Sequence, residues 1–326
     1  MRFSVVVTTR NRPVLLRRAI ASILRQTYDS YEIVVVDDGS EPEFTPDYDA
    51  IAAEMAGKGQ VHHLPPSGSG SGPSRARNHA LSQCRGEFVA FLDDDDEWTD
   101  PDYLGLAAGA LDANPACDLH LMNQQAVAPD GSPVKGPIWI EDLPAKLPPG
   151  ESGTEWRVVT APDLLRSNGF CHLNTCIIAS TLLRTDLGGF DESIRYEEDR
   201  DLYLRAIEAA RLIVYNPRVV SRHYVPDPRS RASASNQLSA DERTAYRLKV
   251  LDKTMACTRQ KAIFEHCRRL KGYALKGLAT REASQRNFDA SYRYAREGLA
   301  TAFSYKWLGF VGWVWLRSRF RSFLLA

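Results

Sequence analysis

The chain has 326 residues, of which 44% are hydrophobic and 25% are charged, a composition that excludes a disordered or fibrous protein. Its 41 basic and 41 acidic side chains cancel, so it lacks the basic excess of proteins that are held to nucleic acid by phosphate charge, and no nucleic-acid partner is expected. The length predicts about two domains.

The cysteines and the first residues point to one cellular compartment. The six cysteines are scattered and none forms a Cys-x-x-Cys pair, so we expect reduced thiols rather than a disulfide framework. The first apolar run is too short for an export signal. No stretch approaches the roughly 20 apolar residues that span a bilayer. The sequence therefore predicts a cytoplasmic protein.

The first hundred residues carry the pattern of a parallel sheet. Residues 3–8 and 32–36 are apolar, largely β-branched runs, as in strands that are buried on both faces. Pro13 opens a stretch of helical periodicity between them, and strand, helix and strand make a right-handed βαβ unit. The later predicted elements are a Gly/Ser-rich loop at 65–73, a helix at 75–84 and a strand at 87–92.

The remaining sequence is mixed up to about residue 225 and helical from about 240. The predicted elements in chain order are a Pro/Gly-rich loop at 141–154, a strand at 175–179, a helix at 197–210, a strand at 212–215 and helices from 240 to the end.

Two buried strands run directly into carboxylates. The segment FLDDDDEW places Asp93 to Asp96 at a strand end, where adjacent negative charges repel one another unless a divalent cation neutralises them. Oxygen ligands suit Mg²⁺ or Mn²⁺, and Asp93 and Asp95 face the same way in an extended segment. The alternative is a solvated acidic loop. We prefer the cation site because ligands bind beyond the carboxyl ends of strands in open α/β sheets.

The second such segment is VVVDDGS, in which Asp37 and Asp38 follow a strand. No Gly-x-Gly-x-x-Gly or Walker-type segment is present, which disfavours a dinucleotide or P-loop site. A carboxylate there can accept hydrogen bonds from a base or a ribose, or it can simply cap the loop.

Five blocks together resemble the family 2 glycosyltransferases. They are VVVTTRNRPVLLRRAIASILRQTY, VVVDDGS, RARNHAL, FVAFLDDDDEW and GGFDESIRYEEDRDLYLRA, in the family's order over residues 1–225. The resemblance implies an α/β GT-A (nucleotide-diphospho-sugar transferase) fold with a mixed, mainly parallel central sheet. It divides residues 1–230 into a nucleotide-binding half (1–100) and an acceptor-binding half (101–230), and leaves 231–326 as a helical C-terminal extension.

The resemblance also implies an activity. It is the transfer of a sugar, with inversion, from a nucleotide-diphosphate donor to a hydroxyl of a glycan or lipid-linked acceptor, with Mn²⁺ or Mg²⁺ as cofactor. UDP is the family's usual nucleotide. The nucleotide- and donor-binding positions are Thr8, Arg10, Asp38, Arg75, Arg77, Asp93 and Asp94. The metal positions are Asp95, Asp93 and His223, the last because some members use a histidine after a late strand.

A second carboxylate site is required by the chemistry. An inverting transfer is a single displacement, so a carboxylate must remove the proton of the acceptor hydroxyl on the face opposite the leaving group. The family's Glu-Asp block matches Asp199 as this base, with Glu198 beside it. On the acceptor side we place Gly189 and Phe190. Trp98 either stacks on the acceptor or packs in the core.

The C-terminal end holds an aromatic segment between basic residues. WLGFVGWVWL, at 307–316, follows Lys306 and precedes Arg317, Arg319 and Arg321. It is too short to span a bilayer but suits the headgroup region of an anionic leaflet. Residues 303–325 therefore predict peripheral contact with a membrane surface, at the inner face of the plasma membrane. The alternative is a helix that docks on the catalytic domain or on a second subunit of an oligomer.

Two other functions remain open from the sequence. A sugar-nucleotide nucleotidyltransferase also joins an α/β sheet to metal-binding carboxylates, but VVVTTRNRP lacks the glycines of its phosphate-binding segment. A non-catalytic sugar-binding or scaffold protein has no need to keep Asp93, Asp95 and Asp199.

Overall fold

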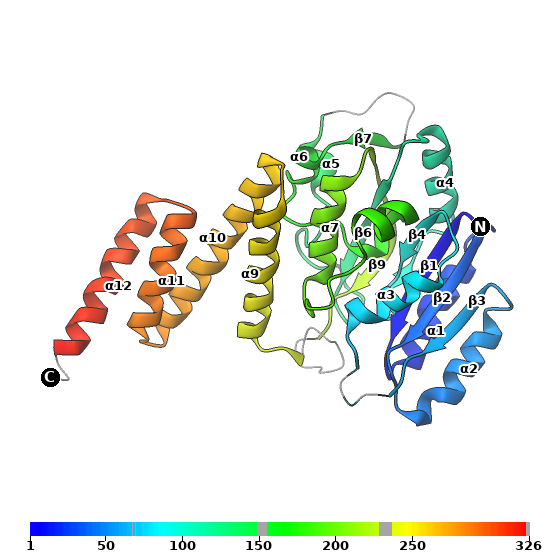
Figure 1. Cartoon of the computed structure of the whole chain (residues 1–326), viewed down its shortest axis with the longest axis horizontal. Coiled ribbons are helices and arrows are strands. Elements are labelled where there is room, and N and C mark those ends of the chain that lie inside the picture. The colour runs from blue at the N-terminus through cyan, green and yellow to red at the C-terminus, as the bar shows by residue number, and fades with distance from the viewer. Residues whose placement is uncertain (67, 69, 149–154, 228–236, 324–326) are drawn as a thin grey trace. The chain divides into compact units, whose positions relative to one another are not determined.

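The computed structural model describes residues 1–66, 68, 70–148, 155–227 and 237–323. The chain divides into two compact units, Met1–Leu238 and Ser239–Ala326 (Figure 1). The first unit is built around one mixed sheet, and the second is helical.

The sheet of the first unit has a parallel half and a mixed half. Its strand order is β3-β2-β1-β4-β8-β6-β9-β5, and β7 pairs with β9. Strands β1 to β4 are parallel to one another, as are β6 and β9, whereas β8 is antiparallel to both β4 and β6. The strands are β1 (Phe3–Thr9), β2 (Tyr31–Asp37), β3 (Gly59–His63), β4 (Phe88–Phe91), β5 (Glu97–Trp98), β6 (Leu119–Val127), β7 (Arg157–Val159), β8 (Cys176–Ala179) and β9 (Ile213–Tyr224).

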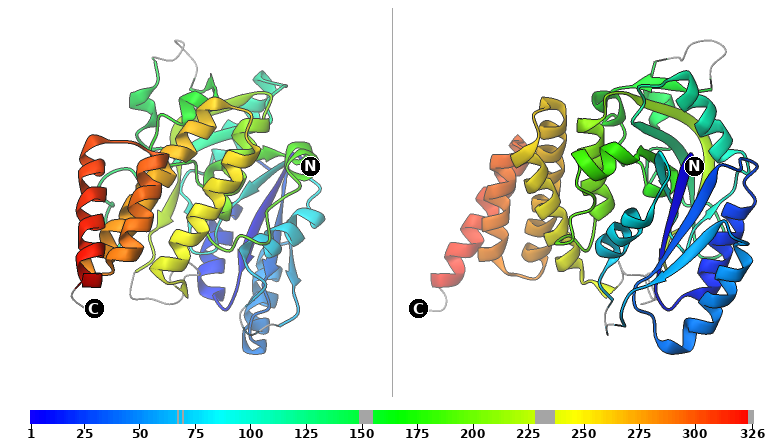
Figure 2. Two further views of the ribbon diagram at one scale, coloured as in Figure 1. Left: turned by 60° about the vertical axis from the view of Figure 1, so that its left-hand side comes forward. Right: turned by 45° about the vertical axis from the view of Figure 1, so that its right-hand side comes forward.

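Helices cover both faces of this sheet. Alternate residues of β1, namely Phe3, Val5 and Val7, pack into one core cluster with α1, α2 and α4. Helix α3 lies on the other face (Figure 2, right). The α-helices of this unit are α1 (Pro13–Leu24), α2 (Thr45–Glu54), α3 (Pro73–Gln83), α4 (Tyr103–Ala113), α5 (Leu143–Lys146), α6 (Ala161–Leu164) and α7 (Glu198–Ala209). Short 3-10 or π turns occupy Pro42–Phe44, Leu173–Thr175 and Leu182–Asp186.

The elements expected from buried apolar runs are confirmed, whereas less regular ones were missed. The run at 3–8 forms β1, the run at 32–36 forms β2, and the predicted helix at 197–210 is α7. Strand β6 was missed because it buries polar side chains such as Asn123 and Gln124, so its sequence does not read as apolar. Strand β9 runs nine residues past Tyr215 although its middle contains Pro217. Of the predicted loops, residues 67, 69 and 149–154 lie outside the described residues.

The second unit confirms the helical C-terminal extension. Its helices are α9 (Ala240–Cys257), α10 (Lys261–Ser284), α11 (Phe288–Thr301) and α12 (Tyr305–Phe323), and each packs on the next. A capping box between Ser239 and Glu242 begins α9. Ala279, Ala295 and Val314 form a small core. In the described part of the chain, no helix has both the length and the apolar character needed to cross a membrane.

Candidate active site

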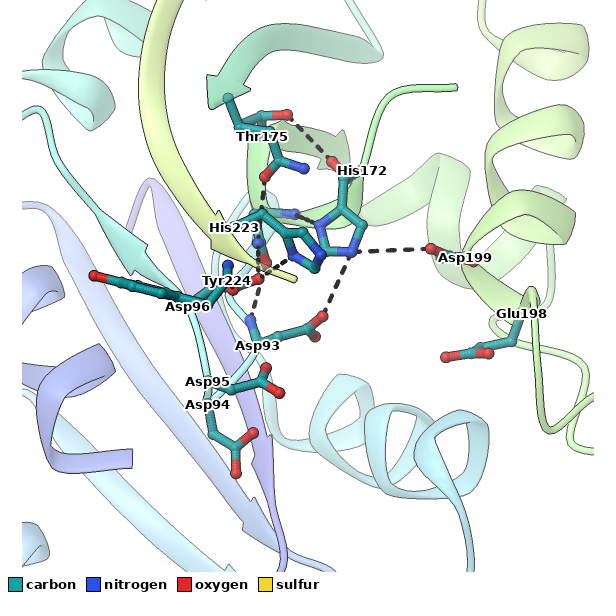
Figure 3. A network of polar contacts seen from close by, with 12 residues as sticks. Asp93, Asp94, Asp95, Asp96, His172, Thr175, Glu198, Asp199, His223 and Tyr224 are labelled. Atoms are coloured by element: carbon teal, nitrogen blue, oxygen red, sulfur yellow. Dashed lines mark hydrogen bonds and ion pairs between the residues drawn. The ribbon is translucent and has the colours of Figure 1, made fainter. Parts of the chain in front are cut away.

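The candidate site lies where the parallel strands end. Thr9, the last residue of β1, is in register with Asp37, the last of β2, and β4 ends at Phe91 just before the four aspartates. Because carboxyl ends of parallel strands share one edge of the sheet, these groups meet where open α/β sheets bind ligands. Figure 3 shows the four aspartates fanning out from this edge.

Two of the aspartates are held by Arg12, which the sequence analysis did not single out. Asp94 is 1% exposed, accepts a hydrogen bond from the Thr9 hydroxyl at 2.7 Å and pairs with the Arg12 guanidinium. Asp95 accepts from Arg12 Nη1 at 3.0 Å. A buried carboxylate requires such partners. The predicted contact of Asp94 with the donor is therefore corrected, since Asp94 is an internal anchor for the turn.

Asp93 is connected to the other side of the site by one arginine. Arg77, which is buried, donates from Nη2 to Asp93 at 2.8 Å and from Nη1 to Glu198 at 2.7 Å. Burial alone would raise the pKa of Asp93, but the charge of Arg77 and its neighbours lowers it to about 2. Asp93 is thus ionised at neutral pH, and Arg77 links the strand end to helix α7.

Asp96 holds His223 at the end of β9. His223 Nδ1 lies 2.9 Å from Asp96 Oδ2, and Asp96 Oδ1 accepts the backbone N–H of Tyr224 at 2.8 Å. Burial opposes the charged form of His223, but Asp96, Asp93 and Asp95 together raise its pKa to about 9. The pair places an imidazole among the carboxylates, as Figure 3 shows.

These residues offer a donor set that fits a divalent cation. Carboxylate oxygens of Asp93, Asp95 and Asp96 lie within 4.8 Å of one another, and so do ligand atoms of Asp96, His172 and His223. Converging carboxylates with an imidazole at the edge match the ligand preference of Mn²⁺ and, for the oxygens, Mg²⁺. Of the predicted metal positions, Asp93 and Asp95 are brought together with Asp96, and His223 reaches this group through its contact with Asp96.

His172 stands between the strand end and the candidate base. Its Nε2 is 3.6 Å from Asp93 Oδ2 and 4.0 Å from Asp199 Oδ2. Nδ1 accepts the backbone N–H of Asn174 at 3.4 Å, which leaves the ring proton on Nε2, facing both carboxylates. Burial lowers the pKa of His172 to about 4, so this imidazole is neutral at pH 7.

The start of α7 places Asp199 and Glu198 in the site. Glu197 adopts a left-handed conformation, with φ 62°, and the helix begins at the next residue. Acidic residues in a first helical turn are favoured by the helix dipole. Burial, reinforced by the charge of Glu197, raises the pKa of Asp199 to about 6. Asp199 is therefore a carboxylate at pH 7 that is basic enough to take a proton.

Three of the predicted nucleotide positions, Thr8, Arg10 and Asp38, lie at the ends of β1 and β2. Asp38 accepts the backbone N–H groups of Ser71 and Gly72, both at 2.9 Å, and Arg10 donates to the Gly68 carbonyl at 3.1 Å. Asp38 and Arg10 thus contact the loop that precedes α3. Two of the predicted residues differ in exposure: Thr8 is partly exposed on β1, and Arg75 is exposed on α3.

Two of the three predicted acceptor residues are in the core. Trp98 is 1% exposed and its indole N–H donates to the Asn174 carbonyl at 3.0 Å, so Trp98 packs rather than stacks on a sugar. Phe190 is 3% exposed and lies under the Arg77 guanidinium, 5.4 Å from the ring centre. Burial contradicts direct acceptor contact by either ring. Gly189 shapes the turn before α7, with φ 77°.

The structure adds four residues that sequence reasoning passed over: Arg12, Asp96, His172 and Trp139. Arg12 and Asp96 lie inside the quoted blocks but were not distinguished from their neighbours. His172 lies between Cys171 and Cys176, whose thiols are buried, and no motif in the sequence marks it. No local pattern marks Trp139, which lies between β6 and α5 and reaches the site only through the fold.

Comparison with known structures defines the fold. The fold matches that of TarS from S. aureus, residues 1–349 in complex with UDP-GlcNAc, with a TM-score of 0.66, 21% identity and coverage of 91% of this chain and 81% of that one. It also matches the mannosyltransferase PcManGT from Pyrobaculum calidifontis, in complex with GDP-Man and Mn²⁺, with a TM-score of 0.55, 18% identity and coverage of 95% and 78%. The first unit is thus a GT-A glycosyltransferase fold, as predicted.

Sequence comparison identifies the family. Residues 4–135 match the model of glycosyl transferase family 2, so this part of the chain belongs to that family. The pre-mycofactocin glycosyltransferase of Mycobacterium tuberculosis is 30% identical over 223 residues, 68% of this chain and 42% of that protein. The GalNAc(5)-diNAcBac-PP-undecaprenol beta-1,3-glucosyltransferase of Campylobacter jejuni is 38% identical over 96 residues, 29% of this chain and 30% of that protein. The chain spans less than half of the length of both relatives.

Proposed function

We propose that the protein is an inverting glycosyltransferase that moves a sugar from a nucleoside diphosphate, with UDP as the nucleotide, to a hydroxyl of a glycan or lipid-linked acceptor. The observation that carries the proposal is the placement of Asp199 across from the aspartates of the strand end, with His172 between them. A single displacement needs one carboxylate that takes the proton of the acceptor hydroxyl and a separate carboxylate group on the side of the leaving diphosphate. The family membership and the UDP-GlcNAc complex of TarS support the donor class.

The chemistry is a single displacement. Asp199 takes the proton of the acceptor hydroxyl, the acceptor oxygen bonds to the anomeric carbon, and the bond from that carbon to the diphosphate oxygen breaks with its electron pair. Asp95, Asp93 and His223 would hold the divalent cation, which when bound neutralises charge on the diphosphate. Arg77 keeps Asp93 ionised and fixes it relative to α7. Asp38, Arg10 and Thr8 are the residues proposed to bind the nucleotide.

The first experiment is a calorimetric titration with UDP, GDP and dTDP, each with Mn²⁺, with Mg²⁺ and with chelator. We expect cation-dependent binding of UDP that is lost in Asp95→Ala. Absence of nucleotide binding by the folded protein, under every cation condition, would contradict the proposal. Binding of GDP in place of UDP would correct only the nucleotide.

The role of Asp199 has a separate test in its pH profile. Because the base must be ionised, kcat/KM for transfer, or for donor hydrolysis by water, should fall about tenfold per pH unit below the pKa of about 6. Asp199→Asn should lower kcat by about 10²- to 10⁴-fold while UDP still binds. A pH-independent rate between pH 5 and 7, or an active Asp199→Asn variant, would remove Asp199 from the base role.

The C-terminal unit supports contact with an anionic membrane surface. The face of α12 opposite its core residue Val314 carries Tyr305, Leu308, Trp315 and Leu316, which are 83%, 48%, 44% and 48% exposed. The basic side chains Lys306, Arg317 and Arg319 are exposed on the same helix. No acidic residue follows Glu297 in the sequence. Aromatic and leucine side chains with basic neighbours bind the headgroup layer of anionic leaflets, and a lipid-linked acceptor would be found there.

A second copy of α12 is a poorer partner for this face. Pairing two such helices would bring basic side chains together without an acidic partner, and like charges in contact are destabilising. Membrane contact at the inner face of the plasma membrane is therefore the proposed location.

A further inference from the structure

A tryptophan that no sequence motif marks stands beside the catalytic centre. The Trp139 ring centre is 4.4 Å from that of His172 and 5.3 Å from that of His223. His172 in turn faces both Asp93 and Asp199. A single imidazole therefore separates this indole from the candidate base. Trp139 is partly exposed, unlike Trp98.

The backbone that carries Trp139 is held from two directions. Its carbonyl accepts from the Ser167 hydroxyl at 3.1 Å, and its N–H donates to Glu141 Oε2 at 2.7 Å. Gly169 packs directly on it, because a Cβ at that position would lie 2.0 Å from the Trp139 carbonyl oxygen. The next residue, Ile140, is buried in the core. The ring is thus placed before any ligand arrives, which lowers the entropy cost of binding.

The packing alone does not account for an indole at this position. Trp139 Nε1 is buried and has no hydrogen-bond partner among the described residues. A buried N–H without an acceptor costs about 1–3 kcal/mol, which a phenylalanine would avoid while keeping the contact with Phe170 and the histidines. Because the indole N–H is a cost to the fold, we explain the indole by contact between its wide apolar surface and a ligand.

The position of Trp139 excludes the nucleotide base as that ligand. Trp139 follows β6, which is separated from β4 by β8, whereas the proposed nucleotide positions Thr8 and Asp38 lie at β1 and β2, on the opposite side of β4. The ring instead borders His172, and His172 faces Asp199, which must meet the acceptor hydroxyl.

We propose that Trp139 is a specificity-determining residue of the acceptor site, where its indole stacks on the apolar face of a pyranose ring and so presents a hydroxyl of that ring to Asp199. This inference rests on the proposed transferase function. Aromatic side chains suit such a site because a sugar ring exposes C–H groups on its faces and hydroxyls at its edge. The proposed stacking predicts that the acceptor unit is a cyclic sugar and not an acyclic polyol.

The test is a binding measurement that needs no turnover. The full chain is labelled with 5-fluorotryptophan, and the Trp139 resonance is assigned from Trp139→Phe. With UDP and Mn²⁺ present, methyl glucoside, methyl galactoside, methyl mannoside and methyl N-acetylglucosaminide are added, with glycerol and ribitol as acyclic probes. We expect at least one pyranoside to shift the Trp139 signal and neither polyol to do so. No shift with any pyranoside, or equal shifts with ribitol, would overturn the inference.

Kinetics separate stacking from a merely structural role. With the pyranoside that shifts the signal as acceptor, Trp139→Ala should raise the acceptor KM by about 2- to 10-fold, the range expected for loss of an aromatic contact. Trp139→Phe keeps an aromatic ring and should therefore raise the acceptor KM by less. Equal losses for acceptor and donor would mean a collapsed site and would overturn the inference. The control is Trp156→Phe, at a second partly buried tryptophan that packs against the core cluster of the sheet, and it should leave the acceptor KM unchanged. Failure of UDP to bind the wild type would instead contradict the proposed function.

Discussion

At the scale of single residues, the site depends on how its buried charges are paired. Arg77 is the clearest case, because one guanidinium serves Asp93 at the strand end and Glu198 at the start of α7. Its side chain is 8% exposed, and those of Asp93 and Glu198 are 24% and 12% exposed, so bulk water could replace this partner only in part. Arg77 therefore contributes to stability and to the geometry of the site together.

We predict that Arg77→Met lowers the free energy of unfolding by about 2–4 kcal/mol, because it leaves two partly buried carboxylates without their cation. Urea unfolding monitored by circular dichroism measures the change. Arg75→Met, two residues away on the same helix but exposed, removes the same charge and should change stability by less than about 0.5 kcal/mol. Similar losses in both variants would show that net charge, and not the pairing of Arg77, matters.

The residues also show which part of the site could be predicted from sequence. Asp93, Asp95 and Asp199 were found because each lies in a motif whose chemistry requires a carboxylate. Trp139, which we propose for the acceptor site, was not predicted, because it differs from Trp98 in exposure only after folding. Asp94 and Asp96 are likewise distinguished from Asp93 and Asp95 only by their partners in space.

At the scale of elements, the turn before α7 sets the position of the base. Gly188 and Gly189 have φ values of 66° and 77°, a region that side chains with a Cβ rarely adopt. Arg205 of α7 donates to the Gly189 carbonyl at 3.0 Å, so the turn and the helix are fixed to each other. The adjacent Phe190 packs under Arg77.

We predict that Gly189→Ala destabilises the protein more than Gly188→Ala does. Both substitutions strain the backbone by about 1–2 kcal/mol, but a Cβ at Gly189 would also lie 2.6 Å from Asn78 Oδ1, whereas one at Gly188 meets nothing within 4 Å. Thermal unfolding of the two variants measures the difference. Equal effects would mean that Asn78 yields without cost and that only the backbone conformation matters.

At the scale of the whole molecule, the protein combines a GT-A unit with a helical unit of a different character. Helix α12 is apolar on two sides. One side packs on α11 through Trp307 and Val314, and the other exposes Leu308, Trp315 and Leu316. An apolar second side is the kind of surface that binds a further partner, and the basic residues of α12 favour an anionic one.

We predict that the protein floats with vesicles containing phosphatidylglycerol at low salt, and less so as salt rises, because screening weakens the attraction of Lys306, Arg317 and Arg319. Leu316→Glu should reduce binding about tenfold or more through loss of apolar burial and added repulsion. Tyr273→Glu, at an exposed site on α10, changes charge equally and should have less effect.

The membrane proposal can fail in two ways. Equal binding of Leu316→Glu and Tyr273→Glu would mean that charge alone drives the contact. Absence of flotation together with concentration-dependent dimerisation would identify a second copy as the partner of α12.

The sequence by itself determined the parallel half of the sheet and the order of the motifs. This was because buried strands and their terminal carboxylates are local features, readable from β-branched runs that end in aspartate. It also determined the family, since five blocks occur in one order. The tertiary structure alone decided that Arg77 joins Asp93 to Glu198, that His223 meets Asp96 and that Trp139 reaches the site. These contacts join residues far apart in the chain, and only the register and twist of the folded sheet bring such residues within reach of each other.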